Sequence, residues 1–199
     1  MNVLEEEPRL TLEACNGSVS AFEALVIHYE PRIRRLIYNM THDVHLTQDL
    51  CQETFLAAYR AMPKMDGAGL NFAPWLYRIA LNQVRSEWRH RKLIVWLPFT
   101  SLRGTRESFE GSAEKPGEEY LVSPDVFEEG VMQRDLVRQV LNQMSDPAVV
   151  CLLLDAEGLS YREIALVVQD SLPAVRSRLN RARHQFQQIY TQLDQEGLL

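Results

Sequence analysis

The stretch SYREIALVVQDSLPAVRSRLNRARHQF, residues 160–186, decides the fold of the C-terminal part of the chain. Ser160 and Glu163 have the spacing of a capping box, in which each side chain satisfies a free backbone donor at a helix start. A short helix is therefore predicted from about residue 161 to residue 168. A polar break follows at residues 169–171, and a second helix begins near Pro173, which a first helical turn tolerates. Two helices joined by a tight turn predict a helix-turn-helix, whose second helix enters the major groove of DNA.

The charge of the second helix supports DNA binding. Residues 171–193 contain four arginines and no acidic residue. An apolar stripe that includes Val175 and Leu179 is expected to pack inward, which leaves polar side chains beside it to read bases and contact phosphates. The candidate contact residues are Arg176, Ser177, Arg178, Asn180, Arg181 and Arg183. A merely solvated basic helix is the alternative, but such helices usually mix charge signs.

A second basic helix is predicted at residues 72–92, FAPWLYRIALNQVRSEWRHRK. One face, within about 40° of a line along the helix, carries basic and amide side chains, while Leu76, Ala80 and Val84 lie opposite. That face consists of Arg78, Asn82, Arg85, Arg89 and Lys92. Nearby aromatic rings could stack on unpaired bases, although core packing is the favoured alternative for Trp75 and Tyr77. The preceding loop, residues 65–71, contains two glycines and could cradle a base.

Upstream, the segment at residues 46–60 is predicted to be a helix with an acidic and polar patch. Asp49, Gln52 and Glu53 cluster on one of its faces. A solvated face is the simplest interpretation of this patch from the residues alone. No spacing here or elsewhere suits metal ligands, a nucleophile with its base, or a phosphate loop, so neither a catalytic site nor a cofactor or metal is expected.

The chain is predicted to be all-α. Helix-breaking residues and the distribution of charge divide it into two small helical domains joined by a linker. Residues 1–17 are expected to be an N-terminal tail and residues 18–92 a helical bundle. Residues 93–130 are rich in Gly, Pro, Ser and Glu and hold three basic and eight acidic residues, a net of −5. This composition predicts a flexible acidic linker. Residues 131–199 form the helix-turn-helix domain.

The position of the charges along the chain says more about function than the overall composition does. The 199 residues carry a net charge of −6, which by itself argues against nucleic acid, yet the linker accounts for most of that charge. Three scattered cysteines give neither a disulfide framework nor a metal motif. No apolar run is long enough to span a membrane and no secretory signal is present, so membrane insertion is not expected and a cytoplasmic location is.

Three segments together resemble the extracytoplasmic-function (ECF) group of bacterial RNA polymerase sigma factors. The family writes region 2 approximately as DLxQExFLxxYR followed by FxxWLYRIAxNxxxDxxRRxR, and this chain has DLCQETFLAAYR and FAPWLYRIALNQVRSEWRHRK. Region 4 runs approximately as GLSYxEIAxxLxxxxGTVxSRLxRAR, against GLSYREIALVVQDSLPAVRSRLNRAR here. The resemblance covers both helical domains, in the family's order.

The resemblance implies a non-enzymatic sigma factor that gives core RNA polymerase its promoter recognition and helps to melt the promoter. It implies that residues 18–92 are region 2 and residues 131–199 region 4. The implied polymerase-binding residues are Asp49, Gln52, Glu53 and Phe55. The implied minus-ten residues are Asn71, Trp75, Arg78, Asn82, Arg85, Arg89 and Lys92. The helix around Arg176 to Arg183 would read the minus-thirty-five element, and an anti-sigma factor is an expected partner.

Two other classes of protein remain to be weighed. A stand-alone helix-turn-helix regulator would bind specific DNA tightly without polymerase. An adaptor that binds polymerase without touching DNA would leave both arginine faces unexplained. An enzyme is the least supported class.

Overall fold

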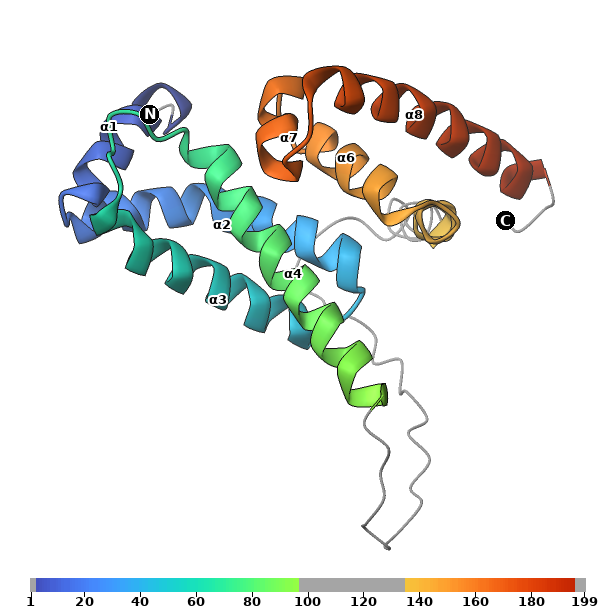
Figure 1. Cartoon of the computed structure of the whole chain (residues 1–199), viewed down its shortest axis with the longest axis horizontal. Coiled ribbons are helices and arrows are strands. Elements are labelled where there is room, and N and C mark those ends of the chain that lie inside the picture. Colours follow the sequence, from blue (N-terminus) through green and yellow to red (C-terminus); the bar gives the residue numbers. More distant parts are fainter. Residues whose placement is uncertain (1–2, 97–134, 196–199) are drawn as a thin grey trace, which may run out of the picture.

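The computed structural model describes the backbone of residues 3–96 and 135–195, and the side chains of residues 6–90 and 135–195. Within these ranges every regular element is helical, which confirms the predicted all-α class. The helices form an N-terminal group and a C-terminal group (Figure 1). The predicted linker at 93–130 lies outside the described residues, apart from residues 93–96, which continue the last helix of the N-terminal group. No helix within the described residues is both long and apolar enough to cross a membrane.

The N-terminal domain is a bundle around a fully buried aromatic and aliphatic core. Tyr29, Ile33, Phe72, Leu76 and Tyr77 are at most 1% exposed. Burial of such side chains is the main stabilising contribution to a bundle of this size. Its elements are α1 (Val3–Cys15), α2 (Val19–Thr41), α3 (Val44–Ala61), the short helix η1 (Met62–Lys64) and α4 (Phe72–Trp96).

The first seventeen residues differ from the expected tail. Most of them form α1, whose residues Leu10, Thr11 and Ala14 are buried. The hydroxyl of Tyr29 on α2 donates a hydrogen bond to the Glu7 carboxylate, which ties α1 to the bundle. The acidic residues at positions 5–7 suggested a solvated tail, but the residues that follow them form an apolar helix face. This face packs against the bundle.

Helix α2 begins at Val19, only four residues after α1 ends at Cys15. Gly17, in the turn between them, has a φ of 93°, the left-handed conformation found at many helix ends. The chain is then free to begin a new helix at once, and Ser18 is the N-cap, whose hydroxyl accepts from the Ala21 amide at 3.3 Å. A serine at this position satisfies a donor that would otherwise lack a partner.

The C-terminal domain contains the predicted helix-turn-helix. Helix α6 (Asp146–Ala156) ends before Gly158, which has a φ of 88°. Helix α7 (Tyr161–Val168) has the predicted bounds, and Ser160 and Glu163 form the predicted capping box. Helix α8 (Leu172–Gln195) follows the break, and residues 135–142 contribute a further helical segment. Ile164, Val175 and Leu179 are buried between the helices, so the apolar stripe of α8 packs inward as predicted.

The two domains contact each other through α4 with α7 and through α2 with α6 (Figure 1). Arg35 of α2 donates from Nε and Nη2 to both carboxylate oxygens of Glu157, at 2.6 and 2.7 Å. The side chain of Glu157 is only 5% exposed. Tyr77 is close to the same carboxylate: burial first, and then the charge of Glu157, raise the pKa of this tyrosine. The ion pair therefore joins the domains between a shielded carboxylate and an arginine that remains partly in contact with solvent.

Candidate nucleic-acid and polymerase interfaces

Helix α8 presents five of its six candidate DNA-contacting side chains to solvent, and the sixth, Arg178, is half-buried. The exposed side chains flank the stripe that is buried against α6 and α7; they are Arg176, Ser177, Asn180, Arg181 and Arg183. Within residues 6–90 and 135–195 neither Arg176 nor Arg181 forms an ion pair, and Arg181 Nε donates to the Ser177 carbonyl oxygen of its own helix at 3.4 Å. The remaining donors of both guanidinium groups are available to phosphates or base edges. This arrangement suits the recognition helix of a helix-turn-helix.

Arg178 has a different environment from its neighbours on α8. Its Nη2 donates to Asp170 at 2.7 Å and its Nη1 approaches the Cys151 sulfur at 3.8 Å. The hydrogen bond from Arg178 holds the pKa of the Asp170 carboxyl below its usual value. Asp170 lies in the break between α7 and α8, so this ion pair links α8 to the turn that precedes it.

Arg183 is also engaged within its own domain. Its guanidinium donates to Asp155 at 2.7 Å and to the Tyr161 hydroxyl at 2.9 Å, and it lies over the Tyr161 ring at 5.7 Å. These contacts pin α8 to α6 and α7. Neither acidic partner was predicted: Asp170 lies in the polar break of the helix-turn-helix and Asp155 lies before it on α6, and neither is on the helix that carries the arginines.

Helix α4 carries its predicted polar face on the outside of the bundle. Arg78, Asn82, Arg85 and Arg89 are exposed on it. The side chain of Lys92 lies outside the described residues. On the opposite side, Leu76, Ala80 and Val84 are at most 1% exposed, as the helical pattern predicts.

The aromatic residues and the loop before α4 divide between core and surface. Tyr77 is fully buried, as favoured on its pattern. Trp75 is half-buried and lies against the Phe72 ring, with centroids 5.8 Å apart. Asn71 is exposed at the end of the loop. Only part of the Trp75 ring is therefore available to a base.

One end of the polar face of α4 lies beside α7 of the C-terminal domain. Arg78 faces Gln169, the residue that ends α7 in a left-handed conformation. With its amide oxygen turned toward α4, Gln169 accepts from Arg78 Nε at 3.2 Å and from Nη2. The minus-ten candidate Arg78 is thus held by the helix-turn-helix, while Asn82, Arg85 and Arg89 lie further along α4.

The acidic patch of α3 lies beside an apolar groove between α2 and α3. Asp49, Gln52 and Glu53 are exposed, and Phe55 is 8% exposed. The groove has a volume of about 970 Å³ and runs between side chains of both helices. The residues lining it are Phe22, Val26, Glu30, Arg34, Tyr38, Val44, Thr47, Gln48, Cys51, Gln52, Phe55, Leu56 and Tyr59. Exposed apolar side chains in a groove of this kind indicate a protein-binding surface.

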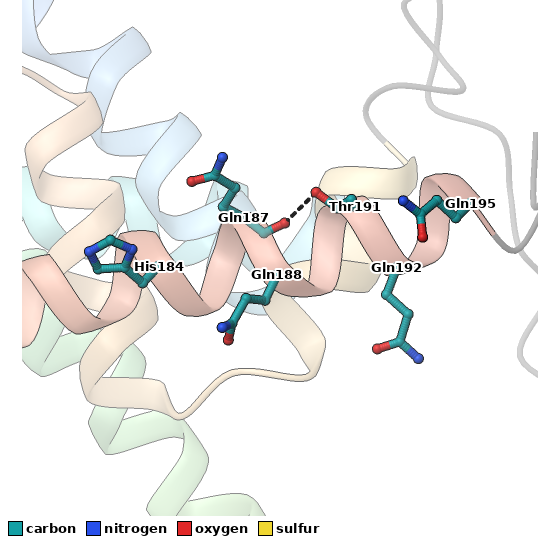
Figure 2. Close-up of a pocket in the computed structure, with 6 residues that line it drawn as sticks. All are labelled: His184, Gln187, Gln188, Thr191, Gln192 and Gln195. Carbon is teal, nitrogen blue, oxygen red and sulfur yellow. Dashed lines mark hydrogen bonds between the residues drawn. The ribbon is translucent and has the colours of Figure 1, made fainter.

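A second depression runs along the C-terminal half of α8. It has a volume of about 450 Å³, and Figure 2 shows its six side chains projecting from this one helix. They are His184, Gln187, Gln188, Thr191, Gln192 and Gln195. The Thr191 hydroxyl donates to the Gln187 carbonyl oxygen at 2.9 Å, so it serves the helix itself (Figure 2). The surface offers amide hydrogen bonds and one imidazole.

Both helical domains match known families in the order in which they occur. Residues 25–94 match Sigma-70 region 2, and residues 134–185 match Sigma-70, region 4. The RNA polymerase sigma-H factor of Pseudomonas aeruginosa is 34% identical over 185 residues, which cover 90% of this chain and 91% of the relative. The chain belongs to the ECF group of sigma-70 factors.

Other relatives agree with this assignment. The ECF RNA polymerase sigma-E factor of Haemophilus influenzae is 30% identical over 178 residues, with 84% of this chain and 86% of the relative covered. Among solved structures, CnrH in complex with the cytosolic domain of CnrY has a TM-score of 0.67 at 22% identity, covering 92% of this chain and 95% of that chain. The sigma factor RpoE of Bartonella quintana, in complex with the anti-sigma factor NepR, has a TM-score of 0.65 at 21% identity, covering 87% and 98%. At these identities the structures show the shared fold.

The sigma factor therefore confers promoter recognition on bacterial RNA polymerase during transcription initiation. Its partners are the core polymerase and promoter DNA. The family consists of non-catalytic initiation factors. A stand-alone regulator would account for the helix-turn-helix but not for the region 2 domain, so that alternative is not favoured.

Proposed function

We propose that this sigma factor reads promoters through two separate helix faces, with α8 at the minus-thirty-five element and α4 at the minus-ten element. The supporting observation is that exposed arginines concentrate on one helix of each domain, although the chain as a whole is acidic. Two separated basic faces suit a DNA molecule contacted at two sites, because phosphate contacts provide most of the affinity and side chains in the groove provide the specificity.

On α8, Arg176 and Asn180 are assigned to base edges and Arg181 to the phosphate backbone. Arginine reads guanine with two hydrogen bonds and asparagine reads adenine in the same way. Arg178 and Arg183 are assigned a supporting role, because ion pairs with Asp170 and Asp155 already occupy them. DNA binding would have to compete with those pairs.

On α4, the exposed residues Asn82, Arg85 and Arg89 are assigned to the minus-ten element, together with Asn71 of the preceding loop. Arg78 joins them only when Gln169 moves away. Binding to polymerase would therefore separate the two domains, so that the minus-ten face and the minus-thirty-five face contact the same promoter at once.

The groove between α2 and α3 is assigned to a helical segment of the polymerase clamp. Its apolar walls would bury part of that segment, while Asp49 and Glu53 at the edge would select a basic partner surface. Charged edges around an apolar centre are the usual anatomy of a protein interface.

An anti-sigma factor is the proposed inhibitor of this chain, and the cytoplasm, where the polymerase works, is its proposed location. Two solved relatives of the same fold are complexes, one with the anti-sigma factor NepR and one with the cytosolic domain of CnrY. An inhibitor of this kind would cover the groove and the two arginine faces.

A promoter library with randomised bases at both elements tests the assignment of the two faces. Transcripts made with core polymerase and each variant are sequenced to obtain base preferences. Arg176→Ala should change preference at the minus-thirty-five element alone, by about 1–3 kcal/mol at one position. Asn82→Ala should change preference at the minus-ten element alone. The assignment fails if either variant alters the other element instead.

A further inference from the structure

The loop that precedes α4 is pressed against α1 at Gly67. This glycine is buried and has an ordinary backbone conformation, so the close approach explains why no side chain is present. A Cβ atom at Gly67 would lie 3.0 Å from the Leu12 Cα, 3.1 Å from the Cys15 Cβ and 3.2 Å from the Leu12 Cδ1. The shortest of these contacts is to backbone, which cannot rotate away.

The rest of the loop is ordered around this contact. Asp66 accepts a hydrogen bond on Oδ1 from the Ala68 amide at 3.1 Å, and its carbonyl oxygen accepts from the Gly69 amide at 3.3 Å. Asp66 also lies near α1: burial first, and then this carboxylate, raise the pKa of the Cys15 thiol. Ala68, Gly69 and Asn71 are exposed on the outer side of the loop.

Helix α1 is itself held firmly, so it can act as a support. Thr11 is fully buried, Leu10 and Ala14 are nearly so, and the Tyr29 hydroxyl donates to Glu7. Leu12, in contrast, is 42% exposed, and its role is the contact with the loop rather than the core. A shift of α1 would therefore be transmitted to the loop through Leu12 and Gly67.

We propose that α1 is a positioning element for minus-ten recognition, and that the contact between Gly67 and Leu12 sets the height at which the loop presents its outer residues to an unpaired promoter base. The inference rests on the proposed function of the loop and adds the N-terminal helix to it. Leu12 and Gly67 are positioning residues, because neither one needs to touch DNA.

The two glycines of the loop provide a matched test. A Cβ at Gly69 would meet no atom within 4 Å, so Gly69→Ala adds the same methyl group without displacing α1. Gly67→Ala requires α1 or the loop to shift by a few tenths of an ångström. Leu12→Ala removes the side chain whose Cδ1 lies over Gly67 and leaves the Leu12 Cα in place, at a residue exposed enough for the fold to tolerate the change.

The assay is transcription with core polymerase on templates that are already unpaired at the minus-ten element, with each of the four bases at the position the loop reads. The ratio of rates between the best and the worst base is compared within one protein preparation. A loss of folded protein lowers all four rates equally and leaves the ratio unchanged. We expect Gly67→Ala and Leu12→Ala to reduce the ratio by about fivefold or more, and Gly69→Ala to keep it within about twofold.

The outcomes separate this inference from the proposed function. If the unaltered protein shows no base preference at any minus-ten position, the proposed role of the loop fails. If the unaltered protein discriminates and a folded Gly67→Ala protein discriminates equally well, the positioning role of α1 is overturned. If Leu12→Ala discriminates equally well, the role of the Leu12 side chain is overturned, whether or not Gly67→Ala folds. A reduced ratio in Leu12→Ala, with unchanged preference at the minus-thirty-five element, supports it.

Discussion

Replacing Arg35 with alanine should open the contact between the two domains of this sigma factor. Arg35 makes the bidentate ion pair with Glu157, and the Glu157 side chain is 5% exposed while that of Arg35 is 57% exposed. Arg35→Ala leaves a shielded carboxylate without its cationic partner. The expected cost to the closed arrangement is about 2 kcal/mol, the penalty of an unsatisfied charged group rather than that of an exposed pair.

A change of about 2 kcal/mol corresponds to roughly a thirtyfold shift toward separated domains. Energy transfer between dyes at the exposed residues Glu23 of α2 and Gln188 of α8 would report the separation. Arg34→Ala is the matched control, because Arg34 pairs with Glu30 of its own helix at 3.3 Å and does not reach the C-terminal domain.

Energy transfer should fall in Arg35→Ala and remain unchanged in Arg34→Ala. Binding to DNA containing a minus-ten element should also improve in Arg35→Ala, since Arg78 is released from Gln169. Equal transfer in a folded Arg35→Ala protein and in the unaltered protein would show that the ion pair makes no contribution to the contact between the domains.

Three further predictions concern separate surfaces. Arg178→Ala should lower the melting temperature of the C-terminal domain by several degrees, whereas Arg176→Ala should leave it within a degree or two, as calorimetry would measure. Glu53→Lys should weaken binding to core polymerase about tenfold at low salt, and Glu23→Lys should not; equal effects in a salt titration would reject the α3 surface. His42 ends α2, and its pKa is lowered first by desolvation and then by the charge of Arg138, which belongs to the C-terminal domain. The closed arrangement therefore favours the neutral imidazole, and energy transfer between the domains should decrease as the pH falls below about 6.5. A pH dependence that persists in His42→Asn would assign the effect to another group.

Helices whose ends are set by nearby capping residues could be predicted from the sequence, and α7 is an example. The capping residues Ser160 and Glu163 and the glycine at 158 act within a few residues of each other, so the bounds of α7 follow from local chemistry. The buried face of α4 could likewise be predicted, because Leu76, Ala80 and Val84 recur with the helical period.

Features that depend on distant residues could not be predicted in the same way. Arg178 and Arg183 have the spacing of DNA contacts, but their partners lie eight and twenty-eight residues away and become neighbours only when the helices pack. The docking of α1 and the ion pair between Arg35 and Glu157 are also tertiary. Residue patterns within one helix contain no information about such contacts.

Run-off transcription with purified core polymerase tests the central claim most directly. Genomic fragments are transcribed with core enzyme alone, with the sigma factor alone, and with both, and the start sites are sequenced. We expect transcripts only when both are present, from a restricted set of promoters that share minus-ten and minus-thirty-five elements. A folded protein that gives no start sites beyond those of core enzyme alone would contradict it.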